Sequence, residues 1–150
     1  APSNAQVGLV ASGGGVFVAQ NQATHLFGFA VVERPDGSVR GHLLVVEPAT
    51  QGYVLNDVTS YLFIGDTLFM AGTILRAHNA PAQFVEGATG FFAVNDNGNG
   101  CWNSAPDQIT SLGVVPSFLG NLTAQQIFAL IGPPPAAAFA PLLAGNLRIR

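Results

Sequence analysis

Charge is scarce in this 150-residue chain, because Asp, Glu, Lys and Arg together make up only 9% of it. A typical soluble domain carries about 25% of such residues. The five basic residues are all arginines, and the net charge is −3. With no basic cluster, the sequence argues against nucleic-acid binding. It also indicates that a large surface is covered, or that the protein works where ordinary solubility is not required.

Long apolar runs and paired cysteines are also missing. No run reaches the ~18–20 residues of a membrane-spanning helix, so no span is expected. Cys101 is the single cysteine and cannot form a disulfide within the chain. An unpaired cysteine in an exported protein is either buried and inert or forms a link between molecules. We expect Cys101 to be buried, because free cysteine is among the most buried residue types. The chain begins Ala1-Pro2-Ser3 without Met, as a chain does after a leader is removed, so we expect an exported, extracellular protein.

What the chain has in quantity is apolar residues punctuated by turns. Hydrophobic residues make up 49%, with 11 Phe, 18 Gly and 10 Pro. This pattern predicts a single all-β domain over residues 1–150, an antiparallel β-barrel or β-sandwich of roughly seven to nine strands. The expected strands lie, in order, at residues 6–11, 16–19, 24–33, 39–47, 53–64, 67–76, 89–94 and 145–150.

Two hairpins can be given a register. In the first, the turn at 34–38 predicts that Arg34 pairs with Val39, so that Glu33 faces Arg40 and Phe29 faces Leu44. One face then carries His25, Phe27, Phe29, Val31, Leu44 and Val46, and the other carries Leu26, Gly28, Ala30, Val32, Leu43 and Val45. In the second hairpin, around Gly65-Asp66, Phe63 faces Leu68 and Leu62 faces Phe69. Apolar residues on both faces predict a filled interior and a covered exterior, partly by contacts between subunits.

From these registers we expect a set of residues in the core or in an apolar interface. The set is Phe27, Phe29, Val31, Leu44, Val46, Phe63, Leu68, Phe91 and Ile149.

The N-terminal region, residues 1–15, is predicted to be a flexible strand followed by a glycine hinge. The hinge is Gly13, Gly14 and Gly15, after Ser12. Such a strand can pair with the sheet of a neighbouring subunit and so build a fibre. The residues of this assembly strand are Gln6, Val7, Gly8, Leu9, Val10 and Ala11.

One helix interrupts the strands near the C-terminus, inside an insert at residues 112–143. Thr123-Ala124-Gln125-Gln126 fits a capping box, and Ile127, Leu130 and Ile131 share one face. Gly132 and the three prolines after it end the helix, which we expect over residues 124–131.

Short motifs spread along the chain resemble a known family. They are Gly13-Gly14-Gly15-Val16-Phe17, Phe27-Gly28-Phe29, Gly65-Asp66 with Ala71-Gly72-Thr73, Asp96-Asn97-Gly98, and Gly145-Asn146-Leu147-Arg148-Ile149. Together they resemble the post-COAP type, a small secreted domain of exported bacterial proteins. The resemblance implies a compact antiparallel β-barrel or sandwich outside the cell, with no established activity. The insert at 112–143 departs from the family pattern.

Few residues suggest chemistry. His25 and His42 share a face in the register above but lie on the order of 20 Å apart, too far to share a metal ion, and His78 falls in a loop. The loop around Asp96, Asn97, Asn99 and Asp107 is rich in oxygen atoms, as a calcium site is. However, it fails the EF-hand pattern, and a tight turn explains it better.

Asn121 begins a formal glycosylation sequon, Asn121-Leu122-Thr123. Ser12 lacks the Gly-x-Ser-x-Gly pattern of a nucleophile loop, and a flexible linker is the better interpretation. Glu33 and Glu47 are expected on opposite faces, unlike the facing acids of a glycosidase. The sequence therefore names no catalytic residue, no metal and no cofactor.

Three functions stay open. The first is an exported, non-enzymatic structural protein that assembles with copies of itself into a filament, pilus or surface layer by donating its N-terminal strand. The second is a secreted β-barrel that binds a small apolar ligand inside. The third is a barrel enzyme with few catalytic groups.

Overall fold

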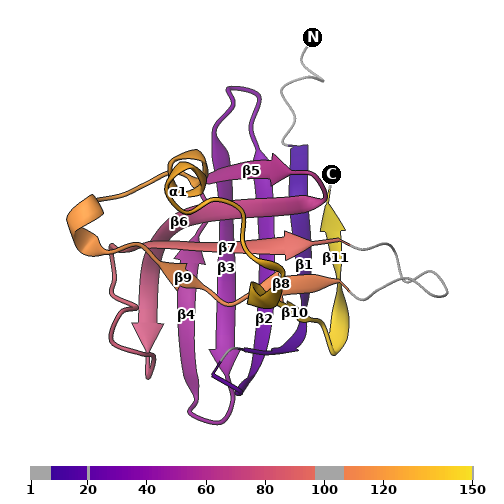
Figure 1. Ribbon diagram of the computed structural model, residues 1–150, viewed down its shortest axis with the longest axis vertical. Coiled ribbons are helices and arrows are strands. Elements are labelled where there is room, and N and C mark those ends of the chain that lie inside the picture. The colour runs from indigo at the N-terminus through magenta and orange to yellow at the C-terminus, as the bar shows by residue number, and fades with distance from the viewer. Residues whose placement is uncertain (1–7, 20, 97–106, 150) are drawn as a thin grey trace, which may run out of the picture.

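Strands run in two directions in the computed structural model, which describes residues 8–19, 21–96 and 107–149 (Figure 1). The strands are β1 (Gly8–Val18), β2 (Thr24–Glu33), β3 (Val39–Glu47), β4 (Gly52–Asp57), β5 (Ser60–Ile64), β6 (Thr67–His78), β7 (Thr89–Asn95), β8 (Gln108–Thr110), β9 (Gly113–Val114), β10 (Phe139–Pro141) and β11 (Ala144–Ile149). One α-helix, α1 (Ala124–Ile131), lies between two 3-10 turns, η2 (Ser117–Leu119) and η3 (Ala136–Ala138). The expected all-β fold with one short helix is confirmed.

All strand pairs are antiparallel and form one curled sheet, a half-barrel. The order is β10-β8-β7-β6-β4-β3-β2-β1-β11, with β5 added on β6 and β9 on β7. We call β11, β1, β2, β3 and β4 the first layer and β5 to β10 the second layer. In Figure 1 strands β1 to β4 run vertically and β5 to β7 cross them. Strand β6 joins the layers, because residues 67–73 pair with β7 and residues 74–78 pair with β4.

The expected strand at 53–64 is wrong, because it is two strands in different layers. Strand β4 pairs with β3, and β5 pairs with β6. The chain turns between them at Val58, which is fully buried and donates its N–H to the carbonyl of Gly41. The apolar run at 53–64 therefore gives no sign of the bend between β4 and β5, because the buried valine at the bend cannot be told from any other strand residue.

The register expected for the first hairpin is wrong by one residue. The turn holds five residues, with the Arg34 N–H donated to the Ser38 carbonyl and the Asp36 carboxylate accepting from Ser38. Glu33 therefore lies opposite Val39, and Phe29 lies opposite Leu43. A shift of one residue exchanges the faces of a strand. The second hairpin has the expected register, with Phe63 opposite Leu68 and Leu62 opposite Phe69.

The main core fills the space between the two layers. Its largest fully buried members are Phe17, Leu43, Leu68, Met70, Phe92, Ile109 and Leu147, with Phe27, Phe29 and Val31 beside them. Ile149 packs against this core. Leu44 and Phe63 were expected in the core or an interface but are 41% and 39% exposed, and Leu44 faces outward because of the register shift. Val46 is half-buried.

A second, smaller core lies between the second layer and α1. Ala124 and Ile127 of the helix pack with Phe69, Ala71 and Ala93, and Phe91 lies at the margin. The helix has the expected bounds and capping box, with Gly132 at its end. Leu130 and Ile131 do not join this core and are 63% and 58% exposed. The insert thus covers the outer face of the second layer and leaves the outer face of the first layer uncovered by any residue that the structure describes.

The glycine hinge is wrong. Gly13, Gly14 and Gly15 lie inside one continuous strand, β1, which pairs with β2 on one side and β11 on the other. The strand needs glycine here because its neighbours approach closely. A Cβ on Gly15 would come within 2.2 Å of the Ala144 carbonyl oxygen, and one on Gly13 within 2.6 Å of Leu147. Three glycines in a row indicate close packing here, not freedom to swing.

The close packing around Gly15 can be tested by substitution. Gly15→Ala should lower the free energy of unfolding by about 1–3 kcal/mol, because the new methyl group meets backbone that must shift. Gly28→Ala is the matched control, since a Cβ there meets only the Gly13 carbonyl oxygen, at 4.0 Å. The control should be neutral or slightly stabilising. Urea unfolding of the three proteins measures both effects, and equal stability of the two variants would contradict the packed-strand account.

The burial of Phe29 in the main core can be tested in the same way. Phe29 is 6% exposed and Phe118 is 84% exposed. Phe29→Ala should cost about 3–5 kcal/mol of unfolding free energy, because it opens a cavity between the layers. Phe118→Ala should cost less than ~0.5 kcal/mol. A loss below ~1 kcal/mol for Phe29→Ala would show that the ring is not packed as described.

Candidate functional site

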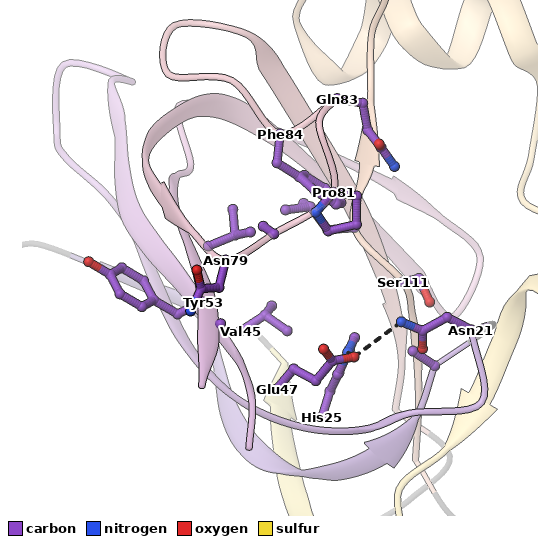
Figure 2. A pocket seen from close by; sticks show the side chains of 15 residues that line it. Asn21, His25, Val45, Glu47, Tyr53, Asn79, Pro81, Gln83, Phe84 and Ser111 are labelled. Carbon is purple, nitrogen blue, oxygen red and sulfur yellow. Dashed lines mark hydrogen bonds and ion pairs between the residues drawn. The ribbon is translucent and has the colours of Figure 1, made fainter. Parts of the chain in front are cut away.

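A pocket of about 260 Å³ opens at one end of the half-barrel (Figure 2). It lies where the inner faces of β2, β3 and β4 reach their ends, and the segment after β6 closes its far side. We call it the mouth pocket. Its wall combines the apolar side chains of Val45, Val54, Pro81, Phe84 and Leu112 with a polar cluster formed by Asn21, His25 and Glu47.

The register of β2 and β3 places the polar cluster. His25 is two residues before the buried Phe27, and Glu47 is two residues after Val45, so both side chains belong to the inner face. Leu26 pairs with Val46, which brings His25 and Glu47 to opposite positions. The cluster therefore sits where the inner face changes from a packed core to open space.

Glu47 is the centre of the cluster. Its Oε1 accepts from Asn21 Nδ2 at 3.2 Å and contacts His25 Nε2 at 3.1 Å, and its Oε2 accepts from Thr50 Oγ1 at 2.6 Å. Figure 2 marks the bond between Asn21 and Glu47. The Thr50 hydroxyl, and then His25, hold the pKa of Glu47 below its ordinary value, because they stabilise the carboxylate. At neutral pH the Glu47 side chain is thus a carboxylate.

The opposite wall comes from the segment that follows β6, which contributes apolar Pro81 and Phe84 and polar Asn79 and Gln83. In Figure 2 Phe84 and Pro81 lie across the pocket from Glu47 and His25. The Phe84 N–H is donated to the Pro81 carbonyl, which folds the segment into a turn. Asn79, with φ of 49°, begins it and donates its side-chain amide to the Thr50 carbonyl. Thr50, in the turn between β3 and β4, therefore contacts both sides of the pocket. Its hydroxyl bonds to the Glu47 carboxylate, and its carbonyl accepts from Asn79 at the start of the opposite wall.

The histidines do not lie as expected. His25 is on the inner face, whereas His42 is exposed on the outer face opposite Ala30, so they do not share a face. His78 ends β6 and does not lie in a loop, and its ring packs against Tyr53 at 5.8 Å between centroids. Among the residues that the structure describes, no group of three or more His, Cys, Asp or Glu side chains could hold a metal ion.

The oxygen-rich loop is only partly described. Asn97, Asn99 and Cys101 lie outside the described residues, while Asp96 follows β7 directly. Asp107 is buried and has a structural role. Its Oδ2 accepts from the Leu147 N–H at 3.0 Å, and its carbonyl accepts from the Leu142 N–H at 2.8 Å, so it fixes the start of the closing strand.

The other expected sites lie apart from the mouth pocket. Gly8 and Leu9 pair with Glu33 and Val32 of the same chain, and Val10 and Ala11 are buried in its core. Gln6 and Val7 lie outside the described residues. Asn121 is exposed, and its side-chain oxygen accepts from the Thr89 hydroxyl at 3.1 Å.

The polar cluster is what the sequence analysis missed. The signal was present, because His25 and Glu47 stand at the matching ends of two strands joined by one hairpin. Only the correct register places them opposite each other. A five-residue turn would have revealed the pair, and the four-residue turn that we expected concealed it.

Comparisons with protein-family models, with curated proteins and with solved structures give no match. The resemblance to the post-COAP type therefore stays a prediction. In the described ranges no helix has the length and apolar character needed to cross a membrane.

The cause of the Glu47 pKa shift can be tested. Thr50→Val removes the hydroxyl that contributes most, so the pKa of Glu47 should rise. A depressed pKa in the folded state stabilises the fold above the ordinary value of 4.5, and that stabilisation is lost as the pH falls through the folded pKa. The melting temperature of the unmodified protein should therefore fall more steeply than that of the variant on acidification below pH 4.5.

Carboxyl carbon NMR of Glu47 measures the pKa directly. Thr24→Val, at an exposed position at the start of β2, is the control and should leave the Glu47 titration unchanged. An unchanged titration in Thr50→Val would contradict the assignment of the hydroxyl as the main cause.

Proposed function

We propose that this protein is an exported, non-enzymatic binding protein that holds a small ligand in the mouth pocket. The observation that carries the proposal is the Glu47 carboxylate, held by Asn21 and His25 in a wall that is mostly apolar but also includes Asn79, Gln83 and Ser111. A few polar groups that orient a ligand within an apolar pocket are typical of small-molecule sites, and barrel mouths often hold them. The ligand then has an apolar body and a hydroxyl or amino group directed at Glu47.

The size of the ligand follows from the filled interior. Phe17, Phe27 and Leu43 are buried below the pocket, so a ligand stays in the mouth and does not enter the barrel. Phe17 packs edge-on against the His25 ring, with 5.5 Å between centroids, and forms part of the pocket's support. An apolar cavity of about 150 Å³ is enough to hold benzene. The mouth pocket, at about 260 Å³, suits a molecule of one or two rings.

The charge of the ligand follows from Glu47. A carboxylate only accepts hydrogen bonds and has about four lone-pair sites. Asn21, His25 and Thr50 occupy three of them. A ligand donor can use the remaining site on Oε2, and a cationic amine gains charge attraction as well. An anionic ligand would meet repulsion at the same position.

The other two functions have less support. Assembly by a donated N-terminal strand would require Gly8–Ala11 to leave a strand that already pairs with β2. It would also need a flexible hinge where three glycines are packed inside β1. An enzyme that used His25 as a base would need the ring to contact a nucleophile, but its Nε2 contacts Glu47.

Three probes with the same ring test the proposal. We expect benzylamine to bind more tightly than benzyl alcohol, and benzyl alcohol more tightly than toluene, because they differ in what they offer Glu47. NMR titration of the amide signals measures each affinity, with shifts expected at Asn21, His25, Glu47 and Phe84. Glu47→Gln should weaken benzylamine binding about tenfold, or ~1.4 kcal/mol, and leave toluene unchanged.

Asp66→Asn is the matched control, since it removes one carboxylate from an exposed turn. It should leave all three affinities unchanged. Equal affinity for the three probes, or shifts located away from the mouth pocket, would rule out the proposed function.

A further inference from the structure

The outer face of the first layer exposes large apolar side chains beside polar ones. The apolar side chains include Leu9, Leu26 and Leu44, at 40%, 42% and 41% exposure. The outer face of the second layer also carries apolar side chains, but α1 covers them. In the described part of the chain, the face made by β11, β1, β2, β3 and β4 has no such cover. We call it the open face.

The registers arrange the open face in rows that cross the five strands. From β11 to β4, the first row is Ala144, Val16, Leu26, Val46 and Tyr53; the second is Asn146, Gly14, Gly28, Leu44 and Leu55; the third is Arg148, Ser12, Ala30, His42 and Asp57. A shorter fourth row, on β1, β2 and β3 only, is Leu9, Val32 and Arg40. The middle of the face is therefore built from small residues, and larger side chains stand on β3 and β4.

We propose that the open face binds the open face of a second copy, with a two-fold axis parallel to the strands and centred on β2. This rotation keeps each row on itself and reverses its order. Strand β2 then lies over β2 of the other copy, β1 lies over β3, and β11 lies over β4. A contact of this kind is self-complementary and closes at two subunits.

The sizes of the side chains fit this arrangement. Leu44 on β3 lies over Gly14 on β1 of the other copy, and the two Gly28 residues meet on the axis. The outer face of a curled sheet is convex, so small residues in its middle and large ones on its flank make it flatter. Close approach of two sheets needs this relief, because packed sheets lie about 10 Å apart.

The charges fit as well. Arg148 and Asp57 stand at opposite ends of the third row; Asp57 is half-buried, and its Oδ1 accepts the Thr73 N–H. The strand-parallel axis places Arg148 of each copy over Asp57 of the other, which gives two pairs of opposite charge. An in-plane axis perpendicular to the strands would instead place each β11 on β11 of the other copy and lay Arg148 on Ala144. The charge pattern therefore selects the first axis.

The area of the open face sets the expected strength. Five strands ~4.8 Å apart and three rows ~6.8 Å apart give a face of roughly 20 Å by 24 Å. Two such faces bury on the order of 1,000 Å² in total, near the lower limit for a specific interface. We therefore expect a dimer that dissociates in the micromolar range.

Sedimentation velocity of the full chain, from about 1 to about 200 μM, tests the dimer. The unmodified protein should shift from monomer to dimer across this range. Leu44→Glu and Gly28→Arg should each weaken the dimer at least ~10-fold. A side chain at Gly28 projects into open space, with the nearest heavy atom 4.0 Å from its Cβ, so this variant should keep its melting temperature.

Leu130→Glu is the matched control, because Leu130 is also exposed but lies on α1. It should dimerise like the unmodified protein. A monomer at every concentration, an unchanged dimer in both open-face variants, or a dimer lost only in Leu130→Glu would overturn the proposal.

A charge reversal tests the axis. Arg148→Glu places two acidic groups together at each end of the dimer and should weaken it about tenfold. Arg34→Glu makes the same change in the exposed turn between β2 and β3, and should have no effect. Equal dimer strength in the two variants would contradict the strand-parallel axis. The melting temperature of each variant, followed by circular dichroism, serves as an independent check that it is folded.

Discussion

The register of the β2–β3 hairpin is the constraint on which both surfaces of this protein depend. Because Glu33 pairs with Val39, the phenylalanines of β2 and Leu43 of β3 point into the barrel together. The same register brings His25 opposite Glu47 at the mouth and turns Leu44 outward. A five-residue turn, stabilised by hydrogen bonds between Asp36 and Ser38, thus determines which residues enter the core, which form the polar cluster and which are exposed on the outer face.

The two layers show different solutions for an apolar outer face. The second layer is covered by α1, which is held by the Ala124 N–H donated to Ser60 and by the Gln125 amide donated to the Tyr61 carbonyl. The first layer has no equivalent segment among the described residues. Its outer face therefore keeps Leu9, Leu26 and Leu44 exposed, beside a few polar residues.

The sequence was informative where a local rule determines the structure. The helix at 124–131 followed from its cap and its glycine, and the hairpin at Gly65-Asp66 followed from a two-residue turn. It misled where the decisive contact is distant. The corner at Val58 depends on a carbonyl of β3, and the glycines of β1 depend on backbone from β11. For the site, the sequence shows His25 and Glu47 at the ends of neighbouring strands. Whether they lie opposite each other depends on the turn between the strands having five residues and not four.

The position of the closing strand has a consequence for folding. Gly13 of β1 pairs with Leu147 of β11, almost the whole described chain away, and the buried Asp107 carboxylate fixes that strand in place. Contacts so distant in sequence must overcome a large loop entropy before they contribute, and they slow folding. Until β11 arrives, β1 has one unpaired edge, and that edge is rich in glycine and close to a bare apolar face. The chain is therefore most prone to aggregate late in folding, after its hairpins have formed and before its first and last strands have met.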